Sequence, residues 1–432
     1  MDYFNIGVIA SYNIRLLLRE KLLWCYTLGV YVVILFAQLS SQSILMRNSS
    51  DIADFSSSVP FMNVFFFLVF QTLPLVILGC HFLYKGRGVD SMEAIYYRSE
   101  SNAEYVYGMF VAFISVFGGA AIFSLLMVLL VHLLFMPFPL GGEYYLFYLF
   151  LVVIPALVFM IGFSFFVVTW IRNRVLSVIF LLGFLGTTIF YLSDCLFGLF
   201  DPLGLSLPSA FSRITGHSDI WGYFLQRGMW FFLGLSFVGL TILKFDRIPN
   251  RVSCVGKRVL VLFFLIIGIV CGGSFFFLQQ NKFWERLNYR SICEKYSSYP
   301  KAYLESQDVD YEQRENEMFV NTKLVVRNRT GKDMSKVLLY LNPGLDITAL
   351  SINGMTSLFE REKQVIIVPA SLSPGDSLLL ELSYKGQIDE RICYLNVPDV
   401  EIADTRKRMY LACRLGKRYS YLRKDFTLLI PE

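Results

Sequence analysis

Residues 144–199 read YYLFYLFLVVIPALVFMIGFSFFVVTWI, then RNR, then VLSVIFLLGFLGTTIFYLSDCLFGL. Each apolar run exceeds the roughly 20 residues with which a helix crosses the ~30 Å hydrocarbon core of a bilayer. Lipid offers no hydrogen-bond partners, so a backbone that crosses it must satisfy its own N–H and C=O groups, as a helix does. The stretch therefore predicts two spanning helices joined in a tight hairpin through Arg172, Asn173 and Arg174, with Trp170 as an interfacial anchor.

Similar apolar runs recur before residue 280, and 55% of the 432 residues are hydrophobic while only 17% are charged. The N-terminus lacks the basic start, apolar core and cleavage site of a signal peptide, so we expect it to remain on the mature protein. The prediction is an α-helical membrane protein of about seven transmembrane helices with a C-terminal extracytoplasmic all-β sandwich domain. The spans are predicted near residues 22–41, 61–83, 105–137, 144–171, 175–199, 223–243 and 259–278.

The distribution of Lys and Arg orients the chain, because short cytosolic loops are enriched in positive charge. With the turn at residues 172–174 in the cytosol, the same side receives Arg15, Arg19, Lys21, Lys85, Arg87, Arg98, Lys244, Arg247, Arg251, Lys257 and Arg258. The short outer loops then keep only Arg47, Arg213 and Arg227. We therefore expect a cytosolic N-terminus, with residues 279–432 in the periplasm or outside the cell. The basic residues follow helix ends and the tail, so nucleic-acid binding is not expected.

An amphipathic pattern precedes the first span. Ser11, Arg15 and Arg19 lie four residues apart on one edge of a predicted helix over residues 3–21. This pattern is typical of a helix that lies along the cytosolic leaflet. The alternative is a longer first span with a frayed start.

A second short helix is predicted between the second and third spans. Asp90 can cap it with Glu93 three residues on, and Met92, Ile95 and Tyr96 then share one face. An apolar face in a cytosolic loop needs a docking partner. The alternative is a surface helix that lies on the membrane.

The third span begins with a capping signal, because Ser101 and Glu104 have the spacing of a capping box. Pro155 lies within the fourth span, where its missing N–H is expected to kink the helix. His132 and Asp194 are ionisable, but both are placed at the outer ends of their helices, where we expect them to be solvated.

This arrangement resembles the type-two family of ABC exporter permeases. That family has an N-terminal elbow helix, six spans, a charged cytosolic loop between spans two and three, and a long outer segment between spans five and six. Residues 99–108, SESNAEYVYG, resemble the family's entry into its third span, and residues 201–222, with Pro202 and Pro208, suit its short re-entrant helices. The resemblance covers about residues 1–250 and depends on order and spacing.

The resemblance implies a permease subunit driven by a separate ATPase, since this chain has no G-x-x-x-x-G-K-[ST] loop for phosphates. No cofactor is expected in this chain, and ATP and Mg²⁺ would be bound by the ATPase subunit. A homodimer or a heterodimer with another permease is implied, and the substrate and the direction of transport stay open. The coupling residues would be Asp90, Met92, Glu93, Ile95 and Tyr96 of the loop, with Arg15 and Arg19 of the elbow helix.

The tail changes to short β-rich runs. They are residues 318–326, 337–342, 347–352, 364–368, 378–384 and 409–414. Turn signals at Pro343-Gly344, Asn353-Gly354 and Pro374-Gly375 separate them. A compact β-sandwich is predicted.

Three phrases of the tail resemble the N-terminal β-domain of gluzincin (aminopeptidase N-like) zinc aminopeptidases. They are LYLNPGL at 339–345, ING at 352–354 and LSYKGQI at 382–388. Those enzymes hold zinc through H-E-x-x-H, yet the only histidines here are His81, His132 and His217. We therefore expect no metal site and no peptidase activity in this chain, and an accessory module that binds a substrate or a separate peptidase-like subunit.

Cys393 and Cys413 share the tail and could form a disulfide if the tail lies outside the cytosol; two free buried thiols are the alternative. The tail also carries a basic cluster, expected to contact lipid headgroups or an acidic partner, or else to be a solvated face. Its members are Arg406, Lys407, Arg408, Arg414, Lys417, Arg418, Arg423 and Lys424.

The leading hypothesis is the permease subunit of a bacterial ABC exporter in the inner membrane. The alternatives are a membrane anchor for a separate periplasmic peptidase, and a membrane scaffold or sensor. The predicted organisation is an elbow helix at 1–21, a six-span permease-like domain at 22–250, a seventh span at 251–278, a linker at 279–317 and the β-sandwich at 318–432.

Overall fold

The computed structural model describes residues 3–47, 58–85, 101–135, 141–192, 195–205, 207, 211–212, 216–217, 219–245, 255–314, 317–389 and 392. The chain forms two compact units. The first contains the residues up to Leu278, and the second begins at Gln279.

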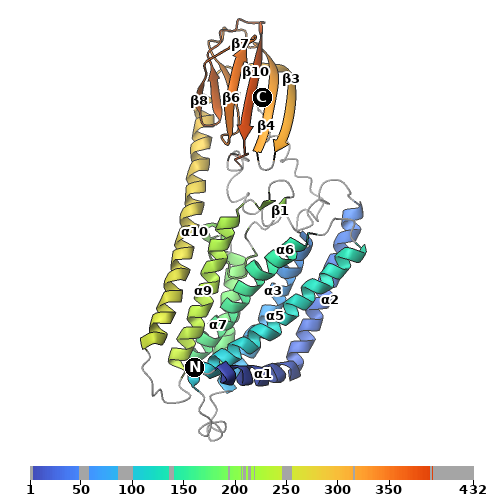
Figure 1. Ribbon diagram of the computed structural model, residues 1–432, viewed down its shortest axis with the longest axis vertical. Coiled ribbons are helices and arrows are strands. Elements are labelled where there is room, and N and C mark those ends of the chain that lie inside the picture. The colour runs from blue at the N-terminus through green and yellow to red at the C-terminus, as the bar shows by residue number, and fades with distance from the viewer. Residues whose placement is uncertain are drawn as a thin grey trace. The chain divides into compact units, whose positions relative to one another are not determined.

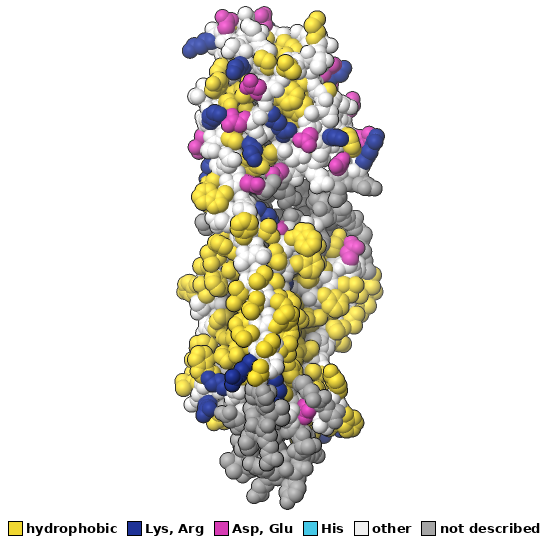
Figure 2. All heavy atoms as spheres, turned by 60° about the vertical axis from the view of Figure 1, so that its left-hand side comes forward, with side chains coloured by type: hydrophobic (Ala, Val, Ile, Leu, Met, Phe, Trp, Pro, Cys, Tyr) yellow, Lys and Arg dark blue, Asp and Glu magenta, His cyan; other side chains and the backbone are white. Residues whose placement is uncertain are grey.

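Unit 1 is helical (Figure 1). Its main helices are α1 (Tyr3–Arg19), α2 (Lys21–Arg47), α3 (Ser58–Lys85), α5 (Asn102–Phe135), α6 (Gly142–Phe147), α7 (Ile154–Ile171), α8 (Arg174–Thr187), α9 (Ile220–Lys244) and α10 (Val255–Tyr296), of which the last continues into unit 2. In the described part of the chain, seven helical segments are long and apolar enough to cross a membrane. Figure 2 shows hydrophobic side chains covering one face of this unit, with Lys and Arg gathered at one end. The predicted number of apolar helices is confirmed.

The predicted hairpin at residues 172–174 is confirmed. α7 ends at Ile171, and Arg172 adopts the left-handed conformation with φ 58°. The side chain of Asn173 then accepts hydrogen bonds from the backbone N–H groups of Val175 and Leu176, which caps α8. Two residues are enough to reverse the chain here.

Pro155 distorts its helix in a particular way. The π-helical turn η2 (Tyr148–Val153) lies between α6 and α7, and Pro155 follows in the first turn of α7. The wider turn accommodates the ring and the missing donor without ending the helix.

Small residues allow close helix contacts in unit 1. A Cβ added to Gly234 of α9 would meet the Cα of Phe159 on α7 at 2.6 Å, and one added to Gly162 would meet the carbonyl of Gly234. A Cβ added to Gly268 of α10 would meet the Cγ of Leu233 at 3.2 Å. Helices in an apolar environment associate through such contacts, because van der Waals packing replaces the hydrophobic effect.

Polar side chains buried between α2, α3 and α5 bind one another. The Nε2 of Gln71 donates to the Oγ1 of Thr27 at 2.9 Å, and the Oγ of Ser124 donates to the Oδ1 of Asn63 at 2.5 Å. The hydroxyl of Tyr31 donates to the carbonyl of Ala120 at 2.9 Å. These bonds connect three helices whose other contacts are mainly apolar.

Unit 2 contains two antiparallel sheets (Figure 1). The five-stranded sheet has the order β3 (Tyr303–Arg314), β4 (Glu317–Arg327), β10 (Ser377–Gly386), β6 (Leu345–Ile352) and β7 (Met355–Thr356); the three-stranded sheet has β5 (Val337–Tyr340), β9 (Val365–Val368) and β8 (Glu360–Glu362). The runs predicted between residues 318 and 384 are all strands, and the three turn signals are turns. The run at 409–414 lies outside the described residues.

The three-stranded sheet is buried on both faces. Along β9, Ile366 and Val368 face the five-stranded sheet, while Val365 and Ile367 face the end of α10. There they pack with Ile292 and Tyr296 of that helix. A strand covered on both sides is apolar at every position, as VIIV is. Unit 2 therefore has three layers, of which the third is a helix.

The predicted linker at residues 279–317 is wrong. These residues contain the last turns of α10, which cover the three-stranded sheet, and β3, which pairs with β4 along its whole length. Neither element shows an apolar pattern in the sequence. α10 continues with charged residues after its apolar stretch ends at Leu278, and β3 is an edge strand in which no side chain is fully buried. The sheet domain begins within α10 and not at residue 318.

A polar contact holds this third layer. The carboxylate of Glu362 on β8 accepts hydrogen bonds from the Nζ of Lys295 at 2.7 Å and from the hydroxyl of Tyr296 at 2.5 Å. These hydrogen bonds lower the pKa of Glu362 below its ordinary value of 4.5, and the bond from Lys295 has the larger effect. A lowered carboxylate pKa stabilises the folded state above the unfolded pKa, and this stabilisation is lost as the pH falls through the folded value.

We predict that the unfolding temperature of unit 2 in the E362Q variant differs most from wild type at neutral pH. The two curves should converge as the pH falls below about 4.5, because protonation then removes the same interaction from wild type. Calorimetry of the full chain in nanodiscs measures this. E360Q, which changes the neighbouring exposed glutamate of β8, should follow wild type throughout, and an identical response of the two variants would contradict the role of Glu362.

Candidate functional site

One candidate site is the contact of α1 with the start of α5. α1 buries Ile9, Ala10, Asn13 and Leu17. A Cβ added to Gly108 of α5 would meet the Cγ2 of Ile9 at 2.6 Å and its Cβ at 2.8 Å, so α1 crosses α5 where α5 has no side chain. Figure 1 shows α1 lying across the end of the bundle at a steep angle to α2. α1 is thus a separate helix, and the alternative of one longer first span is wrong.

The first turn of α5 is tightly fastened. The backbone N–H of Ser101 donates to the Oε2 of Glu104 at 3.0 Å, and the N–H of Glu104 donates to the Oγ of Ser101 at 3.3 Å, which confirms the capping box. The side-chain amide of Asn102 donates to the carbonyl of Phe245, at the end of α9, at 3.0 Å. The ring of Tyr105 stacks on the ring of Phe245. A movement of α1 or of the residues before Ser101 would therefore reach α5 and α9 together.

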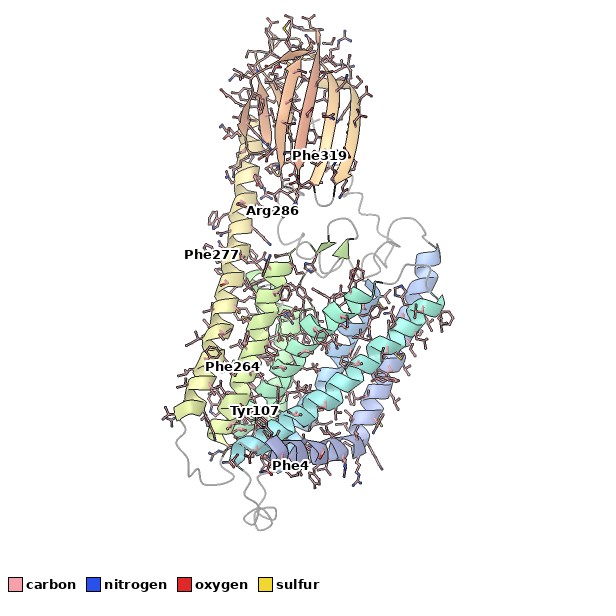
Figure 3. The ribbon with its side chains drawn as sticks, in the orientation of Figure 1. Phe4, Tyr107, Phe264, Phe277, Arg286 and Phe319 are labelled. Atoms are coloured by element: carbon pink, nitrogen blue, oxygen red, sulfur yellow. The ribbon has the colours of Figure 1, made fainter. Side chains whose placement is uncertain are left out.

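We call this contact of α1, the start of α5 and the end of α9 the elbow junction. Its outer side is the exposed face of α1, which carries Phe4, Tyr12, Arg15 and Arg19. Figure 3 shows Phe4 on α1 and Tyr107 on α5 at this end of the unit. Arginines beside exposed aromatic side chains suit a surface that meets both apolar and anionic groups.

Several predicted site residues lie outside the described residues. They are the loop residues Asp90, Met92, Glu93, Ile95 and Tyr96, and the cysteines Cys393 and Cys413. The structure brings Arg15 and Arg19 together on α1, four residues apart, and the predicted coupling loop ends where the described part of α5 begins.

A second candidate site, around Arg227, was not predicted from the sequence. Arg227 was expected in an outer loop, but it lies two turns inside α9, with a side chain among the most deeply buried in the described part of the chain. Its guanidinium donates to the carbonyls of Asp201 and Pro202, and its Nε donates to the Oε1 of Gln226 at 2.6 Å. The charge is tolerated because carbonyl oxygens surround it. A hydropathy reading assigns an arginine to a loop, since only the folded chain supplies such acceptors.

Arg227 fastens the segment between α8 and α9, residues 195–205. The Nε2 of Gln226 donates to the carbonyls of Gly198 and Asp201, both at 3.0 Å. Within the segment Leu196 and Phe197 have positive φ angles of 50° and 62°, which non-glycine residues rarely adopt. Strained backbone persists where its surroundings over-determine it, and here three side chains of α9, those of Gln226, Arg227 and Trp230, bind the segment.

His132 also differs from its expected solvation. Its side chain is 1% exposed, and its Nδ1 lies 3.0 Å from the hydroxyl of Tyr145 at the start of the next span. The pair joins α5 to α6 inside the unit. Asp194 lies outside the described residues.

No group of three or more His, Cys, Asp or Glu side chains in the described residues could hold a metal ion. The histidines of the described part are His81, His132 and His217, all in unit 1.

Comparison with known proteins finds similarity over a fifth of the chain. One M1 zinc metallopeptidase from Deinococcus radiodurans, a mutant bound to a Tyr-Ser-Ala substrate, is 24% identical with a TM-score of 0.19, covering 20% of this chain and 21% of that one. A two-domain M1 zinc metallopeptidase mutant bound to L-tryptophan is 23% identical with a TM-score of 0.19, covering 21% of each chain. This chain thus spans about a fifth of the length of these structures. No family model matches the chain, and no curated protein matches it.

We predict that G108A displaces α1 from α5. The added methyl group has no room beside Ile9, and overpacking costs about 1–3 kcal/mol. The thermal stability of the full chain in detergent should fall accordingly, and I9A/G108A should recover most of the loss. G119A is the matched control on the same helix, because its Cβ would meet nothing within 4 Å. Equal effects of G108A and G119A would contradict the close contact.

We predict that R227M destabilises unit 1 by about 3 kcal/mol, because it leaves buried carbonyl acceptors unsatisfied. R227K should recover little, since one ammonium cannot reproduce the fork of donors. R174M, at the exposed start of α8, is the control and should have almost no effect. Thermal unfolding in detergent measures the differences. If R227M unfolds at the same temperature as wild type, the segment at residues 195–205 keeps its conformation without Arg227.

Proposed function

We propose that this chain is the permease subunit of a bacterial ABC exporter in the inner membrane, driven by separate ATPase subunits. The observation that carries the proposal is the elbow junction. An amphipathic helix lies across the start of the third span at a glycine and exposes Arg15 and Arg19. The capped start of that span follows directly after the predicted coupling loop.

In the proposed mechanism, the contacts of the elbow junction transmit movement from the ATPase subunits to the spanning helices. Closure of the ATPase subunits on ATP and Mg²⁺ would push on the exposed face of α1 and on residues 90–96. Ile9 against Gly108 would pass the push to α5, and the bond from Asn102 to the carbonyl of Phe245 would pass it to α9. Interdigitated side chains at van der Waals distance transmit such displacements, because packed cores are hard to compress.

At its other end, α9 would act on the segment at residues 195–205. Gln226, Arg227 and Trp230 bind this segment to α9, so a shift of α9 would move or release it. A strained segment between two spans suits a gate of the substrate path, because a modest push can change its conformation. In this proposal the cytosolic N-terminus faces the ATPase, and a homodimer or heterodimer of permeases encloses the path.

The test is to purify the tagged full chain from its native membrane and to measure the ATP hydrolysis that copurifies. We expect an ATPase to copurify with the wild-type chain. The copurifying ATP hydrolysis should fall at least about tenfold in R15E/R19E, because charge reversal repels an acidic docking surface. K257E/R258E, which reverses two charges at the start of α10, is the matched control and should keep the activity. A chelator-sensitive peptidase that copurifies without an ATPase would favour the peptidase anchor, and neither activity would favour a scaffold.

A further inference from the structure

The long edge of the five-stranded sheet is open. β3 is twelve residues long and pairs with β4, and among the described residues no strand lies on its other side. Figure 1 shows β3 at the margin of the sheet. An unprotected edge presents a row of backbone N–H and C=O groups that another strand can pair with, and proteins usually shorten, bend or cover such edges. The opposite edge, β7, is only two residues long.

The two faces of β3 differ in chemistry. Val309 lies opposite Thr322, and Tyr311 opposite Val320, which are both buried, so these side chains share the core face of the sheet. Nevertheless Val309 is 43% exposed and Tyr311 is 55% exposed. The apolar face of the sheet thus continues onto β3 without a cover.

The other face of β3 is acidic. The strand carries Glu305, Asp308, Asp310 and Glu312 against a single base, Arg314. Glu305 pairs with Arg327 at 3.0 Å, and Glu312 pairs with Arg314 at 2.9 Å. Lys323 lies opposite Asp308, but its ammonium pairs with Glu381 of β10 at 3.0 Å. Asp308 and Asp310 therefore give the middle of the strand an excess of negative charge.

This charge disfavours a second copy of the chain as the occupant. If two β3 strands paired antiparallel about Val309, Asp308 of each would lie opposite Asp310 of the other. Like charges directly opposite one another destabilise a strand pair. Lys or Arg side chains at those positions would be favourable, with apolar side chains between them against Val309 and Tyr311.

We propose that β3 accepts an added strand from a separate protein, an extended segment in which Lys or Arg alternates with apolar side chains. Backbone hydrogen bonds would supply affinity, and the alternation would supply specificity. The site lies within unit 2, so it does not depend on transport by unit 1.

The test is hydrogen exchange by mass spectrometry on the full chain in nanodiscs, read on the amides of residues 303–314. The probe is a capped heptapeptide of alternating lysine and valine. We expect it to slow exchange along β3 by about tenfold or more at saturation, because added ladder bonds protect amides. The same peptide with glutamate in place of lysine should leave exchange unchanged.

Two controls separate strand addition from adsorption by charge. A lysine–valine peptide methylated at every second backbone nitrogen keeps its charge but cannot complete the ladder, and it should not protect β3. D308N/D310N should weaken binding of the unmodified peptide about tenfold. D333N/D376N, which removes the same charge from two loops, should bind like wild type. Circular dichroism and the exchange of β4 amides confirm that each variant is folded.

Equal protection by the lysine and glutamate peptides, or by the methylated peptide, would overturn the proposal. So would protection, before any peptide is added, of the β3 amides that point away from β4 and do not bond to it. If that protection rises with protein concentration, the occupant is a second copy. If it disappears when Lys417, Arg418, Arg423 and Lys424 are replaced by glutamine, the occupant is the chain's own basic stretch.

Discussion

The close approach of α7 and α9 at Gly162 and Gly234 is the contact on which unit 1 depends. Two backbones meet where neither helix has a side chain, and the flanking rings of Phe159 and Trp230 pack edge to face at 4.5 Å between centroids. Both candidate sites of the unit also involve α9. The carbonyl at its end binds α5, its outer turns hold the segment at residues 195–205, and α10 packs along its length. A change in α9 therefore affects both candidate sites.

Buried polar groups give this apolar bundle its specificity. Dispersion contacts between Leu, Val and Phe side chains tolerate many alignments, whereas a buried amide or guanidinium permits few, because an unsatisfied group is costly. Gln71 with Thr27, Asn63 with Ser124 and Arg227 with two carbonyls each connect different elements. The register of these helices is thus defined by a small set of hydrogen bonds within a large apolar surface.

Features encoded over a few neighbouring residues could be predicted from the sequence. The hairpin at residues 172–174, the capping box at Ser101 and the turn at Asn353-Gly354 each depend on local chemistry, and all are present. Features that depend on distant partners could not be. Arg227 is buried because carbonyls some 25 residues earlier in the chain accept hydrogen bonds from its guanidinium. β3 was missed because an edge strand buries too little to show an apolar pattern, although its alternation of Val309 and Tyr311 with acids was a signal. The part of the elbow junction formed by Gly108 and Asn102 was missed because a lone glycine or asparagine carries no periodic signal.

The pairing register of the strand Val365–Val368 is not fixed by its own side chains. A strand with one polar face cannot slip by one residue without exposing its apolar side chains, but a strand that is apolar at every position has no such penalty. In unit 2 the register of this strand is instead fixed by polar residues just before it. Gln364 donates to the carbonyl of Tyr289 at 2.7 Å, and Glu362 binds Lys295 and Tyr296. A slip would break these bonds to α10. Valine and isoleucine should therefore interchange within this strand over evolutionary time, while the two polar positions before it should be nearly invariant.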